Sequence, residues 1–100
     1  MHPEIDELNK LLERVIDRKS FLDFVKALIR DREDEIEKEK ESPSNPYGPE
    51  ANGWGNSTIE AYLESSVAWT EDSIGGEHEL PEEASWKSLA RFLYAGKYYE

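Results

Sequence analysis

The residues with the clearest chemical potential lie between positions 71 and 83, where carboxylates surround one of the two histidines. Six acidic residues occur there without an intervening Lys or Arg: Glu71, Asp72, Glu77, Glu79, Glu82 and Glu83. Carboxylates beside an imidazole are able to hold a cation or to transfer a proton. However, the segment around His78 has no second His or Cys at ligand spacing and lacks the Asp/Asn spacing and central Gly of a calcium loop. We therefore expect no metal site, and the carboxylates are left as a charged surface.

Other catalytic patterns are missing from the sequence as well. His2 is isolated at the N-terminus, and the absence of cysteine excludes a thiolate nucleophile, a disulfide framework and a Cys-type zinc site. The segment Gly53-Trp54-Gly55 has neither the third glycine nor the preceding strand of a dinucleotide site, and no phosphate-binding Gly-Lys-Ser/Thr segment occurs. We expect a protein without catalytic residues and without cofactors.

The charge balance points to the kind of partner. The net charge is −11, from 23 acidic and 12 basic residues, whereas nucleic acids and anionic membrane surfaces select clustered Lys and Arg. Residues 43–100 hold ten acidic and three basic side chains, a net charge of −7, against thirteen and nine, a net charge of −4, in residues 1–42. A basic protein surface suits this distribution, although solubility alone also explains an acidic chain.

The ends and the apolar runs bear on localisation. Met1-His2-Pro3-Glu4 has no basic segment followed by a continuous apolar one, and no apolar run approaches the ~18 residues of a membrane span. Together with the lack of cysteine, this predicts a cytoplasmic chain that neither crosses nor binds a membrane.

Helical periodicity organises the first 41 residues. Apolar residues from Glu4 to Asp17 recur at helical spacing, and we predict a break near Ser20, which is placed to cap a second helix reaching Lys40. The first part of that helix carries a core face, but residues 30–41 contain one apolar side chain among alternating charges. We expect this half to be exposed and to project from the domain, either as a solvated helix end or as an arm that meets a partner.

A Pro-rich loop over residues 42–56 follows and carries two aromatic candidates for partner contact. Tyr47 lies among Pro43, Pro46 and Pro49, so it either folds back on the domain or stands in solvent. Trp54 lies between two glycines and either plugs the core or lines a groove. We predict both as anchors for a partner, with the condition that a fully buried Trp54 is not one.

Two further helices are predicted in the C-terminal half. The third runs from Ser57 to about Asp72, with Asn56 or Ser57 as its cap and Ser65-Ser66 allowing a close helix crossing. The fourth begins at Pro81 or Ser85 and ends with Gly96 as its C-cap, after which the tail docks on the fold. One hundred residues support one core, so we predict a compact all-α single domain, residues 1–100, of about four helices.

The order of these segments resembles a family of small bacterial proteins catalogued as a domain of unknown function. The resemblance covers about residues 20–100. It is carried by Ser20 to Val25, by Trp54-Gly55-Asn56-Ser57-Thr58-Ile59-Glu60-Ala61-Tyr62-Leu63-Glu64, by Ala68-Trp69, by Trp86 to Tyr94 and by the closing Tyr99-Glu100. It implies a bacterial protein and a fold, and it brings no catalytic residue or cofactor with it.

We interpret the chain as a protein-binding module that occludes a basic partner, as the immunity proteins of bacterial toxin systems do. The six carboxylates would form an electrostatic rim around Tyr47 and Trp54. Two alternatives remain: a structural homo-oligomer in place of a monomer, and a small-ligand or enzymatic pocket beside Trp54, which would require a deep site with converging polar groups.

Overall fold

The computed structural model describes residues 3–43 and 52–99, with side chains from residue 7 onward. Within these residues the secondary structure consists of α1 (Pro3–Glu13), α2 (Arg18–Glu41), α3 (Ile59–Asp72) and α4 (Trp86–Tyr98). The described residues contain no strand, and the radius of gyration of 13.9 Å is close to the ~13 Å of a compact 100-residue domain. The predicted all-α fold of four helices is therefore confirmed.

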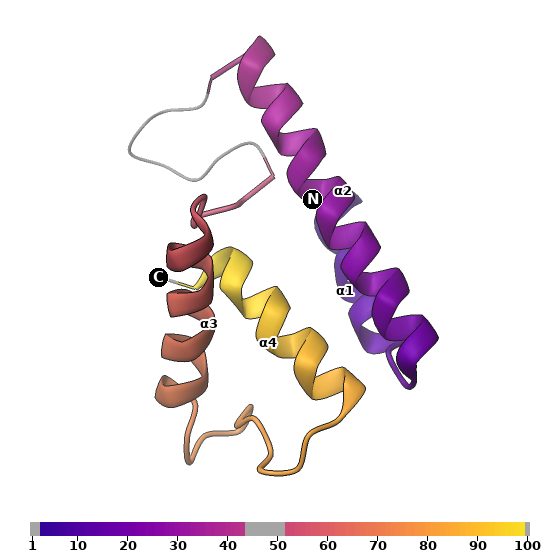
Figure 1. The fold of residues 1–100 in the computed structure, drawn as a ribbon, viewed down its shortest axis with the longest axis vertical. Helices are drawn as coiled ribbons and strands as arrows, with labels where there is room; N and C mark the ends of the chain where they lie inside the picture. Colours follow the sequence, from indigo (N-terminus) through magenta and orange to yellow (C-terminus); the bar gives the residue numbers. More distant parts are fainter. Residues whose placement is uncertain (1–2, 44–51, 100) are drawn as a thin grey trace.

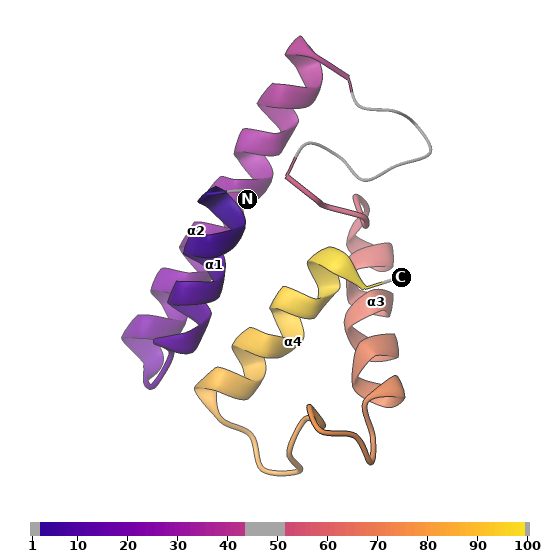
Figure 2. The ribbon, with the colours of Figure 1, turned by 180° about the vertical axis from the view of Figure 1, so that it is seen from behind.

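Helix α4 is the centre of the arrangement. It has α3 along one side and the α1–α2 pair along the other (Figure 1). Seen from behind, α1 lies in front of α2 (Figure 2). Among the described residues, α4 contacts all three other helices, whereas α3 contacts no helix but α4. The front side between α2 and α3 therefore has no helix over it in the described part of the chain.

The core lies where α1, α2 and α4 meet and extends to the segment that precedes α3. Its buried apolar residues lie on these elements and on the α1–α2 connection: Leu8, Val15, Phe24, Leu28, Trp54 and Ala90. Aromatic rings pack around them, with Phe24 and Tyr94 edge to face at 6.2 Å between ring centroids. Burial of such side chains contributes roughly 1.5–3 kcal/mol each, which is what holds a domain of this size together.

The cap of α2 lies three residues earlier than expected. The predicted break near Ser20 is present, but Ser20 is not the cap: Asp17 caps α2. The Asp17 Oδ1 accepts the Ser20 N–H at 2.8 Å, and the Ser20 Oγ accepts the Asp17 N–H at 3.1 Å. This reciprocal capping box satisfies two backbone donors that would otherwise lack a partner, so the helix starts at Arg18.

The cap of α3 also differs from the prediction, whereas the start of α4 agrees with one of its two alternatives. Thr58, not Asn56 or Ser57, caps α3, and its Oγ1 accepts the Ala61 N–H at 3.1 Å. Ser85 caps α4 as expected. Asn56 binds the C-terminal end of α4 instead, as described below.

Small residues bring α3 and α4 close together. The Ser66 Oγ donates to the Phe92 carbonyl at 2.9 Å, and the Tyr62 hydroxyl donates to the Leu93 carbonyl at 2.6 Å. The predicted C-cap at Gly96 is wrong, because α4 continues past it, and the glycine instead lies in this crossing. A Cβ at position 96 would stand 2.9 Å from the Tyr62 carbonyl oxygen and would clash with the Ser66 Oγ. The predicted close crossing through Ser66 is confirmed.

Candidate functional site

The second half of α2 does not form a wholly exposed surface. Its core stripe of Phe24 and Leu28 continues at helical spacing through Asp31 and Glu35, and both acids are buried. The prediction that residues 30–41 are exposed is therefore wrong for these two positions. Figure 1 shows that only the last turns of α2 extend past the ends of the other helices. Buried carboxylates require partners, because transfer of an unpaired charge out of water is very costly.

Asp31 obtains its partners from α4 and from the segment before α3. Its Oδ2 accepts a hydrogen bond from the Lys97 Nζ at 2.5 Å and another from the Trp54 Nε1 at 2.8 Å. The Lys97 side chain is 0% exposed and that of Asp31 is 4% exposed. The ammonium also lies 4.8 Å from the ring centroid of Tyr98 and 5.5 Å from that of Trp54, so aromatic faces complete its surroundings.

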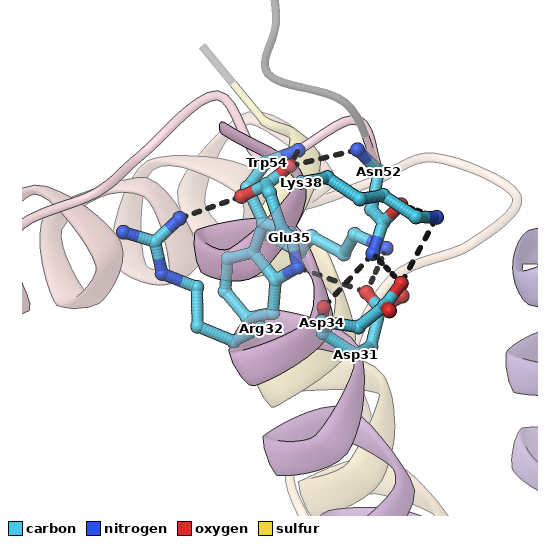
Figure 3. Close-up of polar contacts among 8 residues, drawn as sticks. Asp31, Arg32, Asp34, Glu35, Lys38, Asn52 and Trp54 are labelled. Atoms are coloured by element: carbon cyan, nitrogen blue, oxygen red, sulfur yellow. Dashed lines mark hydrogen bonds and ion pairs between the residues drawn. The ribbon is translucent and has the colours of Figure 1, made fainter. Parts of the chain in front are cut away.

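Glu35 fixes the backbone that carries Trp54. Its Oε1 accepts the N–H of Asn52 at 2.9 Å and that of Trp54 at 3.1 Å, while its Oε2 accepts the Arg32 Nη1 at 2.6 Å (Figure 3). Gly53 between the two donors has φ +87°, a conformation that glycine adopts without steric cost. One carboxylate thus holds a tight turn against α2.

The side chain of Asn52 makes the third connection. Its Nδ2 donates to the Asp31 carbonyl at 2.9 Å and to the Asp34 Oδ2 at 3.1 Å, and its Oδ1 accepts the Lys38 Nζ at 2.8 Å. Lys38 also pairs with Asp34 at 2.9 Å. Figure 3 shows these side chains rising from successive turns of α2 toward Asn52 and Trp54.

Within the described residues, the formal charges of this polar network cancel. It contains three acidic side chains, Asp31, Asp34 and Glu35, and three basic ones, Arg32, Lys38 and Lys97, in contacts that join α2, α4 and residues 52–54. The charged groups are engaged with one another, so the arrangement acts as a clamp for Trp54. Among the described residues, no group of three or more His, Cys, Asp or Glu side chains has the geometry to hold a metal ion.

The clamped Trp54 forms one wall of an apolar groove between α2 and α3. The groove has a volume of about 490 Å³ and is lined mainly by apolar side chains, among them Val25, Ile29, Ile59, Leu63 and Leu93. Tyr62 also lines it, and burial raises the pKa of the Tyr62 hydroxyl to about 12. A groove with this lining favours apolar contact over acid–base chemistry.

The predicted site residues fall into three groups. Trp54 is 7% exposed, and a buried Trp54 was not expected to act as an exposed anchor, so it serves only as a wall of the groove. Tyr47 lies outside the described residues. The six carboxylates are all exposed and lie on the last turn of α3 and on the connection to α4, at one end of the molecule in Figure 1: Glu71, Asp72, Glu77, Glu79, Glu82 and Glu83.

Two of these carboxylates are engaged within the fold. The Asp72 Oδ2 accepts a hydrogen bond from the Tyr99 hydroxyl, which raises the pKa of that hydroxyl, and the Glu79 Oε1 accepts the Gly75 N–H at 3.0 Å. The tail is further tied by Asn56, whose Nδ2 donates to the carbonyls of Gly96 and Tyr99. The predicted docking of the tail is confirmed for the described residues.

The clamp residues were not singled out in the sequence, although a pattern for them exists. Asp31 and Glu35 follow Phe24 and Leu28 at core spacing, and Lys97 is a cation seven residues after the buried Ala90 on α4. Opposite charges on the core faces of two helices predict a buried ion pair when the helices pack together. Helical spacing alone does not identify which helices do so.

Helix length and composition also bear on membrane insertion. Within residues 3–43 and 52–99, no helix combines the length and the apolar character that a membrane span requires.

Comparison with known proteins identifies the family. No significant match to a curated protein or to a solved structure was found. A family model described as "Family of unknown function (DUF7660)" matches residues 17–100, from the cap of α2 through the groove, the clamp and the acidic connection. Because this match covers most of the chain, the protein belongs to the DUF7660 family of unknown function.

Proposed function

We propose that this protein is a non-catalytic binding module whose acidic side, α3 and the connection to α4, occludes a basic surface on another protein. The observation that carries the proposal is the composition of residues 59–85, which hold eight acidic side chains and no Lys or Arg. All eight are exposed: Glu60, Glu64, Glu71, Asp72, Glu77, Glu79, Glu82 and Glu83.

The three basic residues of the C-terminal half do not neutralise this side. Lys97 is buried against Asp31, and the Lys87 Nζ donates to the carbonyl of Glu13 at the end of α1. Arg91 donates to the carbonyl of His78 in the acidic connection and lies 5.5 Å from the ring centroid of Trp69. An excess of exposed negative charge therefore lies on α3, which is on the far side of α4 from the α1–α2 pair, and on the connection at one end of the molecule (Figure 1).

At the end of α3, the position of the charges is unfavourable for the helix itself. Glu71 and Asp72 occupy the last turn of α3, where the helix dipole disfavours negative charge, and that turn carries no basic residue. A basic surface on a partner would offset this unfavourable interaction with the helix dipole. The negative charge would also steer such a partner toward the site.

A protein partner suits the described residues better than a small ligand does. The pocket alternative requires a deep site with converging polar groups, whereas the groove beside Trp54 is mainly apolar and the polar groups behind it bind one another. A chain of this composition without cysteine fits a reducing cytoplasm, which we propose as its compartment.

The test compares capture by the tagged full chain with capture by two charge variants of equal net charge. The first replaces with Gln four exposed carboxylates at the end of α3 and on the connection to α4, none of which forms a side-chain hydrogen bond or ion pair among the described residues: Glu71, Glu77, Glu82 and Glu83. The control replaces with Gln four exposed acids of α1 and α2: Glu7, Glu13, Glu37 and Glu41.

We expect a basic protein to be captured at low salt by the wild-type chain and by the control variant, and to be lost from the first variant. Because exposed charges are screened within about 8 Å at physiological ionic strength, capture should weaken as salt is raised. Equal capture by both variants would exclude the acidic connection from binding.

A further inference from the structure

The groove between α2 and α3 is open along both rims. Ile29 on α2 is 53% exposed, and Ile59 and Leu63 on α3 are 78% and 48% exposed. Side chains of this type on both rims of one groove form a contiguous apolar surface, which marks an interaction site more often than scattered exposed residues do.

The spacing of the rim residues matches the geometry of a helix partner. Ile59, Leu63 and Val67 follow one another at intervals of four residues on α3, so they form one stripe along the helix, and all three are exposed. On α2, Leu22, Ile29 and Ile36 recur every seven residues and are also exposed. From these two stripes, Ile29, Ile59 and Leu63 line the groove, together with Leu93 of α4. Rows of this kind on two neighbouring helices provide the ridges that a further helix packs between.

The charges beside the groove select the helix. Glu60 and Glu64 each follow a residue of the apolar stripe on α3, and Glu71 continues that stripe by one further turn. All three are exposed, and α3 contains no basic residue. On the opposite rim, Arg32 is bound to Glu35 and Glu33 is exposed. A second copy of this chain would bring another net charge of −11, which disfavours self-association.

We propose that the α2–α3 groove binds an amphipathic α-helix of a partner protein, whose apolar face fills the groove and whose Lys or Arg flank lies over Glu60 and Glu64. This inference rests on the proposed function and specifies the partner as helical and basic on one flank. The clamp contributes by holding Trp54 in place as a wall of the groove.

The test uses two synthetic helical peptides of about 18 residues, a length at which isolated helices become stable enough to study. Both carry Leu at positions i, i+3, i+4 and i+7, and they differ only in having Lys or Glu along one flank. Binding to the full chain is followed by methyl NMR and by titration at low salt. We expect the Lys peptide to bind at least tenfold more tightly and to shift the methyl signals of Ile29, Ile59 and Leu63.

A matched pair of isoleucines locates the site. Ile59 lines the groove and is 78% exposed, whereas Ile16 lies in the α1–α2 connection, outside the groove, and is 80% exposed. Ile59→Ser is expected to raise the Kd of the Lys peptide about tenfold, because burial of one such side chain strengthens binding by about that factor. Ile16→Ser is expected to change the Kd less than twofold, and Leu63→Ser serves as a second groove variant.

Several results would overturn the groove proposal. These are equal binding of the two peptides, binding of neither, methyl shifts away from the groove, or equal effects of Ile59→Ser and Ile16→Ser. A wild-type dimer that Ile59→Ser dissociates would assign the groove to a second copy. If the four-carboxylate variant loses the captured basic protein while Ile59→Ser retains it, the proposed function stands and the groove proposal fails.

Discussion

Replacing Lys97 with Met removes the cation from the centre of the clamp while keeping most of the side-chain volume. The Lys97 side chain is 0% exposed and its partner Asp31 is 4% exposed, so the variant leaves a carboxylate in the interior with the Trp54 N–H as its remaining donor. Loss of one member of a buried ion pair costs about 3–5 kcal/mol. Domains of this size have a free energy of unfolding of about 5–15 kcal/mol, so Lys97→Met should remove a large part of it.

Urea unfolding followed by tryptophan fluorescence measures this loss, and thermal unfolding should show a decrease in Tm of more than about 12 °C. The double variant Asp31→Asn/Lys97→Met removes both charges and keeps an acceptor for the Trp54 N–H. It should recover about 2 kcal/mol relative to Lys97→Met alone, because the uncompensated charge is the main cost. A loss below about 1 kcal/mol in Lys97→Met, or no recovery in the double variant, would refute the assignment of a buried ion pair.

Three further predictions concern the α3–α4 crossing and the tail. Gly96→Ala should lower the free energy of unfolding, measured in urea, because its Cβ would clash with Ser66 and Tyr62; a gain of about 1 kcal/mol from helix propensity would contradict this. The pKa of Tyr62 is raised to about 12, so the unfolded state ionises first and stability falls from about pH 10 to 12; Tyr62→Phe should reduce that fall in denaturation midpoints, and an identical pH profile would oppose it. Asn56→Ala should free the carbonyls of Gly96 and Tyr99 and speed amide exchange in the last turn of α4, whereas unchanged exchange would show that the tail is held otherwise.

The helices could be predicted because they depend on local periodicity. The spacing of Phe24 and Leu28, the capping residue Ser85 and the small Ser66 each act within a few residues of their own element, and the structure agrees with the predictions made from them. Trp54 between two glycines was predicted either to plug the core or to line a groove, and it does both.

The clamp could not be predicted because its contacts join distant parts of the chain. Asp31 and Glu35 look like members of a solvated charge run until Lys97 and the backbone of residues 52–54 are placed against them. The same limit applies to Gly96, since a glycine near a helix end fits a C-cap and a close crossing equally well, and the packing of α3 decides between them.

The placement of the acidic residues depends both on the local sequence and on the packing of the helices. Their exposure was predicted from the charge run after α3, whereas the separation of α3 from the basic residues of α1 and α2 depends on α4 lying between them. This separation leaves the acidic side without cations from the rest of the described fold, apart from Arg91 beside His78.

The association rate constant with a captured basic partner tests the central claim most directly. It is measured by stopped-flow at several salt concentrations for the wild-type chain, for the four-carboxylate variant and for the α1–α2 control of equal charge. Electrostatic steering predicts that the four-carboxylate variant associates about tenfold more slowly at low salt and shows a flatter salt dependence, while the control stays close to wild type. Equal rates and equal salt dependence for all three proteins would contradict the claim that the acidic side binds the partner.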